Sequence, residues 1–334
     1  MRISLAWSRD VSSINPLHVY SVVRPIVQKY YRVRLTRYLG RILDDRFATT
    51  RAAAPMTGRK RTGVDLALEL YAKENREQVD ASATTMNAEF RKHAIDNLLT
   101  LLFGGHDTSS STLCYCYHLL WKHPETLAAA REELDGVFGV DISAADQLRE
   151  NPFLVNKLHY LLAVIKEVLR MWPPASAAKQ GRKDLVVRDP TTGEMCPTEG
   201  MTVWINHLVL GRSSKIWGDD VDDFKPERFL PENVAKLPAH AWRPFEAGSR
   251  NCIGQELALM ELKTVLALTL REFDIRSAFD ELTSVREDGS FWTKDGSFRK
   301  GPQKVFGDEM YQVLLLSAKP NEGMPARVKR RKAF

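Results

Sequence analysis

Residues 243–262 read RPFEAGSRNCIGQELALMEL and set a single cysteine, Cys252, directly before a helical pattern. The N-terminus of a helix presents unpaired backbone N–H groups and the positive end of the helix dipole, which favour a thiolate over a thiol. One thiolate suits an axial metal ligand better than a closed zinc site. The helical pattern itself is a stripe of leucines at Leu259, Leu262, Leu266 and Leu270.

The residues beside Cys252 favour a flat ligand that carries a negative charge. Gly248 and Gly254 permit tight turns and a close approach of the backbone to such a ligand, and Arg250 can pair with an anionic group on it. A lone cysteine at a helix start is more often structural. The rest of the chain must therefore decide between a structural cysteine and a metal ligand.

The 334-residue chain has 44% hydrophobic residues and a formal net charge of +6, which fits a folded globular protein. Basic residues gather in segments 30–41, 58–61 and 327–334. We interpret these segments as solvated faces and a frayed terminus; the alternatives are a patch for lipid headgroups, a docking face for a protein partner, or a nuclear localisation signal. No zinc-finger spacing, RNA-binding signature or long apolar run occurs, so nucleic-acid binding and membrane spanning are set aside as main functions.

Cysteine usage and the N-terminal residues indicate a reducing compartment such as the cytoplasm. The first ten residues, MRISLAWSRD, lack the apolar core of a secretory signal. The cysteines are too scattered for a disulfide framework and lie at Cys114, Cys116, Cys196 and Cys252.

Periodicity predicts a mainly helical protein with small β-sheets. One long buried helix is expected over residues 91–120, a second from Pro124 to Gly139, and a third over 154–172. Short β-like runs at 184–189 and 200–208, with turn residues 189–194 between them, predict a small sheet, and 311–318 predicts another strand. We expect a single domain over 1–334, with a helical lead-in and loop over 1–64, a core over 65–318 and a basic tail over 319–334.

The cysteine loop carries a resemblance to a known family. Phe245, Gly248, Arg250, Cys252 and Gly254 fit the pattern Phe-x-x-Gly-x-Arg-x-Cys-x-Gly. This pattern resembles the haem-binding loop of the cytochrome P450 haem-thiolate monooxygenases. The resemblance implies that the core over 65–318 binds haem (heme b), with iron held by the axial thiolate of Cys252.

Two further segments resemble the same family. Glu167-Val168-Leu169-Arg170 is similar to its Glu-x-x-Arg helix, and FKPERF at 224–229 is similar to its Pro-Glu-Arg-Phe segment. The resemblance implies that Glu167, Arg170 and Arg228 form a buried ion-pair network that supports the haem loop. Without the other segments, Glu and Arg at positions i and i+3 would be read as a surface pair.

Gly104 to Ser109, GGHDTS, lies inside the long predicted helix, where two glycines cost roughly 1 kcal/mol each and invite a local distortion. The segment resembles the family's oxygen-activating kink. The resemblance implies that Asp107 relays protons and that Thr108 holds a water near the reacting oxygen, as splitting dioxygen needs two delivered protons. His106 is expected to be no ligand.

Weaker matches and departures also occur. Lys179 stands where the family commonly has an arginine on a haem propionate, and a lysine can act there as a point charge. Gly211 and Ser213 replace a histidine and an acid of the family pattern, which weakens the propionate contact expected at that segment.

The resemblance implies a monooxygenase that inserts one atom of dioxygen into a small apolar molecule, with electrons from an NADPH-dependent reductase. The sequence is closest in style to fungal microsomal members that act in secondary metabolism. The resemblance is convincing over residues 65–318, and the family's N-terminal third is missing, so a truncated member is expected. The alternative is a non-catalytic remnant or a haem-binding fragment. A third interpretation, haem chemistry without dioxygen, is disfavoured because such relatives tend to lack the acid–threonine pair.

The family implies the endoplasmic reticulum membrane as the location. This chain shows no anchor of roughly 20 apolar residues, so peripheral contact through basic segments, or a cytoplasmic location, is expected.

Overall fold

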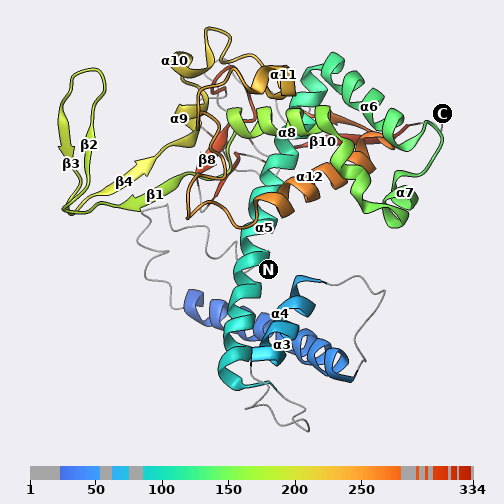
Figure 1. Cartoon of the computed structure of the whole chain (residues 1–334). Coiled ribbons are helices and arrows are strands. Elements are labelled where there is room, and N and C mark those ends of the chain that lie inside the picture. The colour runs from blue at the N-terminus through green and yellow to red at the C-terminus, as the bar shows by residue number, and fades with distance from the viewer. Residues whose placement is uncertain are drawn as a thin grey trace. The chain divides into compact units, whose positions relative to one another are not determined.

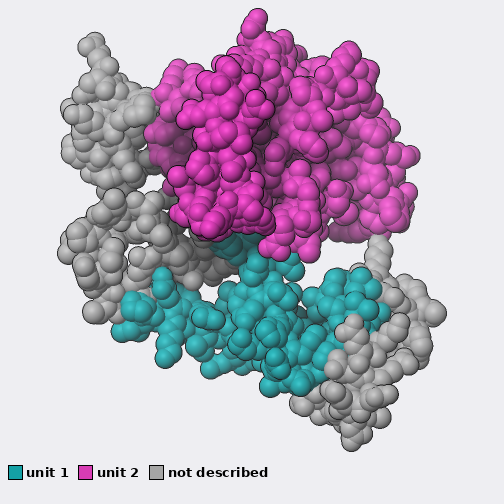
Figure 2. Space-filling view, turned by 60° about the vertical axis from the view of Figure 1, so that its left-hand side comes forward, with its two compact units in different colours: residues 1–104 teal, residues 105–334 magenta. Residues whose placement is uncertain are grey.

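The computed structural model describes residues 23–52, 62–74, 86–279, 291–292, 298–299, 304–314, 317–321 and 323–331. It is mainly helical with small two-stranded sheets, so the predicted fold class is confirmed (Figure 1). The chain forms two compact units, residues 1–104 and 105–334, which Figure 2 colours separately. The expected domain boundaries at 64/65 and 318/319 stay a prediction.

Unit 1 consists of α3 (Val23–Ala52), α4 (Gly63–Glu74) and the start of α5 (Ala88–Lys122). A capping box begins α4, because the Thr62 backbone N–H donates to Asp65 Oδ2 at 2.8 Å and the Asp65 N–H donates to Thr62 Oγ1 at 3.2 Å. The rings of Tyr71 and Phe90 stack at 3.8 Å. The core of this unit consists of Leu39, Leu43, Phe47, Leu68, Tyr71, Met86 and Ile95.

Helix α5 is the long helix predicted over 91–120. Asn87 caps it, since its Oδ1 accepts the Glu89 backbone N–H at 2.8 Å. The helix continues through Gly104 and Gly105 without a break. The hydroxyl of Thr112 donates to the Thr108 carbonyl at 3.0 Å and satisfies that carbonyl locally. Its C-terminal half enters the core of unit 2 through Tyr115, Leu119 and Leu120.

Four further helices of unit 2 surround this core: α6 (Pro124–Phe138), α7 (Ala144–Glu150), α8 (His159–Met171) and α12 (Gln255–Leu270). Helix α6 starts at Pro124 and ends before Gly139, whose φ of 81° suits a glycine, as predicted. The third predicted helix divides into a 3₁₀ turn, η2 (Pro152–Lys157), and α8. The carboxylate of Glu133 caps α8 by accepting the N–H groups of Tyr160 and Leu161 at 2.6 and 2.9 Å.

Five two-stranded antiparallel sheets occur among the described residues. They pair β1 (Ala177–Gln180) with β4 (Thr202–Ile205), β2 (Val186–Arg188) with β3 (Met195–Pro197), β5 (Phe273–Ser277) with β10 (Ala326–Arg330), β6 (Phe291–Trp292) with β7 (Phe298–Arg299), and β8 (Gln312–Leu314) with β9 (Ala318–Pro320).

The predicted pairing of run 184–189 with run 200–208 is wrong. Turn 189–194 closes the hairpin of β2 and β3, which projects from unit 2 in Figure 1, and β4 pairs with β1 instead. The physical reason is the turn, in which Asp189 Oδ1 accepts the N–H of Thr191 at 2.6 Å and Gly193 adopts a φ of 74°. The turn sequence determines where a hairpin closes. Because β2 pairs with β3 in this hairpin, β4 pairs with β1, the strand that precedes β2.

The segment expected to fray at the C-terminus is a strand in part. Residues 326–330 of the predicted basic tail form β10, in register with β5 from Ala326 opposite Ser277 to Arg330 opposite Phe273. The basic segment 58–61 lies outside the described residues. No helix in the described ranges is long and apolar enough to cross a bilayer.

Short elements lie between the sheets and α12. These are α9 (His207–Gly211), α10 (Ser214–Trp217), a 3₁₀ turn η3 (Pro226–Phe229) and α11 (Pro231–Val234). Asn206 begins α9, because its Oδ1 accepts the N–H groups of Leu208 and Val209 at 3.1 and 3.3 Å. Helix α8 packs against both α9 and η3.

Candidate functional site

The loop before α12 holds Cys252 in a defined position. The Cys252 N–H donates to the Phe245 carbonyl at 2.8 Å, and the Asn251 N–H donates to the Gly248 carbonyl at 3.2 Å. Gly248 has a φ of 86°, a conformation that glycine adopts without strain. The cysteine is exposed at the start of α12, whose predicted leucine stripe is buried.

A cavity of about 260 Å³ opens above this loop. Cys252, Phe245 and Arg250 line one wall, and Thr108 of α5 lines the cavity as well. The structure therefore brings together four of the residues predicted from sequence, and Gly248 and Gly254 shape the loop that carries them. The remaining lining residues are mostly small or apolar: Ser109, Thr112, Leu169, Pro174, Ala175, Ser176, Ala177, His207, Pro244, Glu246, Ala258 and Leu262.

Lys179 does not line this cavity. It lies on β1 two residues beyond Ala177, which does line the cavity, and alternate residues of a strand share a face. Lys179 is half-buried on that face. Its predicted propionate contact stays a prediction.

Asp107 is buried, with 5% of its surface exposed, and its carboxylate bonds to the C-terminal β-hairpin. The Ser317 hydroxyl donates to Oδ2, and the Lys319 ammonium donates to Oδ1. These partners stand 210 and 212 residues away in the sequence, so no local pattern pointed to them. The adjacent His106 is exposed.

Glu167, Arg170 and Arg228 form one network. Arg170 Nε and Nη2 donate to the Glu167 carboxylate at 2.7 and 2.8 Å, and both side chains are fully buried. Arg228 Nε lies 3.4 Å from Glu167 Oε1. Arg170 also donates to three backbone carbonyls, those of Gly211 at 2.6 Å, Val221 at 2.8 Å and Asp223 at 3.2 Å.

Sequence reasoning missed a second buried ion pair at the cavity. His207 Nε2 lies 2.8 Å from Glu246 Oε1, and the Arg243 guanidinium donates to Glu246 Oε2 at 2.6 Å. Burial works against the ionised carboxyl, but the hydrogen bonds from His207 and Arg243 outweigh it and lower the pKa of Glu246 below its usual value. The one local signal was Asn206 before a short helical run, which marks a helix start but no partner.

The structure also explains why position 211 is a glycine. A Cβ atom at this position would lie 2.0 Å from the Arg170 carbonyl oxygen, so the close packing of α9 on α8 requires glycine. Its departure from the family pattern therefore reflects packing.

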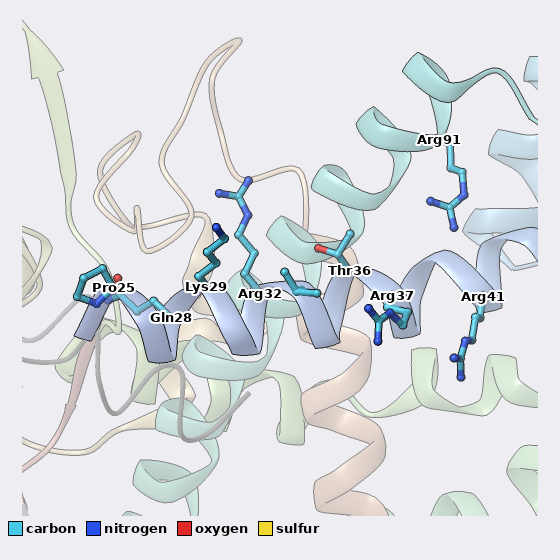
Figure 3. A pocket seen from close by; sticks show the side chains of 9 residues that line it. Pro25, Gln28, Lys29, Arg32, Thr36, Arg37, Arg41 and Arg91 are labelled. Carbon is cyan, nitrogen blue, oxygen red and sulfur yellow. The ribbon is translucent and has the colours of Figure 1, made fainter. Parts of the chain in front are cut away.

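Unit 1 contains a wider hollow of about 840 Å³ along α3. It is lined by Lys29, Arg32, Arg37, Arg41 and Arg91, among others. Figure 3 shows Lys29 and Arg32 on one side of α3 and Arg37 and Arg41 on the other. Arg91 is already paired with Asp44 at 2.7 Å. The cations do not converge on one point, so we interpret the hollow as a solvated basic face.

A cluster of His118, Asp308 and Glu309 has its ligand atoms within 4.8 Å of one another. Asp308 already accepts from His118 Nε2 at 2.7 Å, from the Met310 N–H at 2.9 Å and from Lys122 Nζ at 3.2 Å. The ammonium of Lys122 would repel a cation there. We therefore interpret the cluster as a contact that ties the C-terminal segment to α5.

Comparisons with known proteins agree with this geometry. The model of the family Cytochrome P450 matches residues 8–297. The cytochrome P450 monooxygenase polC of Polytolypa hystricis is 37% identical over 97% of this chain and 56% of its own length. The monooxygenase acrF of Aspergillus aculeatus is 35% identical over 94% of this chain and 63% of its own length. The chain thus spans about 56 to 63% of these curated relatives.

More distant matches extend the comparison. A protein of Bacillus subtilis named bifunctional cytochrome P450/NADPH–P450 reductase 2 is 34% identical over 70% of this chain and 20% of its own length. The crystal structure of the cytochrome P450 CYP102L1 superposes with a TM-score of 0.68 over 99% of this chain and 64% of that chain, at 22% identity. That likeness confirms the predicted fold.

Proposed function

Because this chain belongs to the cytochrome P450 family, we propose that it is a haem-thiolate monooxygenase that inserts one atom of dioxygen into a small apolar molecule. The observation that carries the proposal is the cavity in which Cys252 and Thr108 both stand. A thiolate donor and a hydroxyl that share one small, mostly apolar cavity suit this chemistry. We also propose that the small apolar substrate belongs to secondary metabolism.

The residues present fit a haem. Cys252 would supply a thiolate ligand to the iron, Phe245 and Leu262 would contact the macrocycle, and Arg250 would pair with a propionate, with Lys179 as a second cation. The haem, when bound, would supply the iron chemistry that activates dioxygen. The network of Glu167, Arg170 and Arg228 would support the loop from behind.

Proton delivery would be the task of α5. The Thr108 hydroxyl would hold a water molecule in the cavity, and the Asp107 carboxylate would take up protons and pass them toward that hydroxyl. Lys319 and Ser317 hold the Asp107 carboxylate in place. The apolar lining would keep bulk water from the site.

We further propose an NADPH-dependent reductase as electron donor and a location at the endoplasmic reticulum membrane. The Bacillus subtilis relative is named as a bifunctional protein that combines a cytochrome P450 with an NADPH–P450 reductase, which supports a reductase as the partner. Ile253, Leu257 and Met260 form an exposed apolar row directly after Cys252, with 96%, 65% and 49% of their surfaces exposed. An exposed apolar row of this kind favours contact with another protein.

The first test is spectroscopic. The full chain is expressed with haem supplied, reduced and exposed to carbon monoxide, as wild type, Cys252→Ala and the control Cys196→Ala, which alters the other exposed cysteine. We expect a red-shifted Soret band that Cys252→Ala abolishes and Cys196→Ala retains. Absence of that band in wild type would overturn the haem-thiolate assignment. A band without turnover in the presence of a reductase would support the non-catalytic alternative.

A further inference from the structure

His207 is an unusual histidine because both ring nitrogens face acceptors. Its Nδ1 lies 3.0 Å from the Ala175 carbonyl oxygen and its Nε2 lies 2.8 Å from Glu246 Oε1. The imidazole therefore links two separate segments, the backbone before β1 and the loop before Cys252. His207 has only 5% of its surface exposed, so both contacts are shielded from water.

Glu246 occupies a conformation that an L-residue avoids. Its φ is 63°, in the left-handed region, and it directly follows Phe245, whose carbonyl accepts the Cys252 N–H at 2.8 Å. Within the loop, the Arg243 side chain holds Oε2, and the Glu246 N–H donates to the Arg243 carbonyl at 2.9 Å. The bonds to its carboxylate therefore compensate for strain at the turn that presents Cys252.

The other end of α9 is fixed to α8. Arg170 Nη1 donates to the Gly211 carbonyl at 2.6 Å, and Gly211 leaves no room for a Cβ atom against the Arg170 backbone. Because α9 comprises only five residues, His207 and Gly211 are one helical turn apart. The buried pair of Glu167 and Arg170 thus fixes the helix that carries His207.

We propose that His207 and Glu246 are positioning residues that hold the Cys252 loop, and that the Glu167–Arg170 pair acts on this loop through α9. We name the His207–Glu246 pair the loop latch. The proposal rests on the proposed function in that Cys252 is the haem ligand. The route runs from Arg170 on α8 to Gly211 at the end of α9, and from His207 at the start of α9 to Glu246 in the loop.

The test measures amide hydrogen exchange in peptides spanning 244–254 of the full apo chain. The variants are His207→Gln, Glu246→Gln and the double variant. The control, His118→Gln, removes a buried histidine–carboxylate bond of 2.7 Å elsewhere in unit 2. Loss of a hydrogen bond to a charged group predicts exchange about tenfold faster in each single variant. The double variant should exchange no faster than the singles, and the control should leave the loop unchanged.

Gly211→Ala tests the route through α9 without replacing any residue of either ion pair. The added Cβ must displace α9 from α8, so exchange in the loop should accelerate in the wild-type background. In the His207→Gln background, Gly211→Ala should add nothing. An equal acceleration in both backgrounds would overturn the route, and an unchanged loop in His207→Gln and Glu246→Gln would overturn the latch itself.

The haem-loaded chain separates this proposal from the proposed function. His207→Gln and Glu246→Gln should lower the fraction of the reduced carbon monoxide complex that shows the thiolate band, and His118→Gln should not. If wild type lacks that band altogether, the proposed function fails, while exchange in the apo chain still decides whether the latch holds the loop.

Discussion

Replacing Glu167 with glutamine should destabilise unit 2 by about 4 kcal/mol, because removing one partner from a fully buried ion pair typically costs about 3–5 kcal/mol. The structure argues for the upper half of that range. Glutamine keeps the shape and one acceptor, but Arg170 and Arg228 both face the carboxylate that is lost. Arg170 keeps its three carbonyl acceptors, which satisfy its N–H groups without supplying charge.

The chain offers a control with the same bidentate geometry at the surface. Arg91 donates to Asp44 at 2.8 and 2.7 Å, with side chains 37% and 48% exposed. Pairs of this kind contribute roughly 0–1 kcal/mol because water screens them. Asp44→Asn should therefore cost far less than Glu167→Gln.

Urea unfolding followed by far-UV circular dichroism measures both variants, because Asp44 lies on helix α3 of unit 1, Glu167 lies on helix α8 of unit 2, and the helices of both units contribute to this signal. The unfolding free energy of Glu167→Gln should fall without a change in the slope against urea. If Glu167→Gln and Asp44→Asn lost similar amounts, burial would not govern the strength of the pair, and the reasoning would be refuted.

Three further predictions follow from single contacts. Burial opposes ionisation of Asp308, but the hydrogen bond and charge of His118 outweigh it and hold the pKa of Asp308 well below its usual range. The stabilisation from the ionised Asp308 carboxylate is therefore complete above about pH 4 and is lost as the pH falls further. Asp308→Asn should flatten the fall in unfolding free energy between pH 7 and 3, and parallel curves for wild type and variant would contradict this. Gly211→Ala should lower the unfolding free energy by about 1–3 kcal/mol through overpacking, whereas Gly254→Ala, whose Cβ meets only the Cys252 sulfur at 3.8 Å, should not; thermal unfolding of both variants decides. Burial raises the pKa of the Cys116 thiol, so maleimide labelling of the native chain should reach the exposed Cys252 and Cys196 and spare Cys116 until urea is added.

Local patterns predicted the elements that depend on neighbouring residues. Neighbouring residues determine the leucine stripe of α12 and both ends of α6, which starts at a proline and ends before a glycine. The apolar spacing of residues 91–120 likewise predicted most of α5. The turn residues around Cys252 were readable for the same reason. The spacing of Glu167 and Arg170 on one helix indicated only a surface pair, and the buried network was implied by the resemblance to the family; the structure pairs the two side chains with both fully buried.

Contacts between distant segments were not predictable. Glu246 and His207 are 39 residues apart, and the partners of Asp107 lie more than 200 residues away. The predicted strand pairing was wrong for a related reason, because a pattern of alternating residues indicates a strand but does not determine which strand it pairs with. The position of Lys179 beside the cavity, and not in its lining, likewise depends on how β1 pairs with β4.

The bond between Asp107 and the β8–β9 hairpin has a consequence for synthesis on the ribosome. Asp107 emerges 210 residues before Ser317, an interval of about 10 to 40 s at ordinary elongation rates. During that interval the middle of α5 carries a carboxylate whose hairpin partners do not yet exist. Asp107 can therefore make its bonds to Ser317 and Lys319 only after the segment 317–319 has been synthesised.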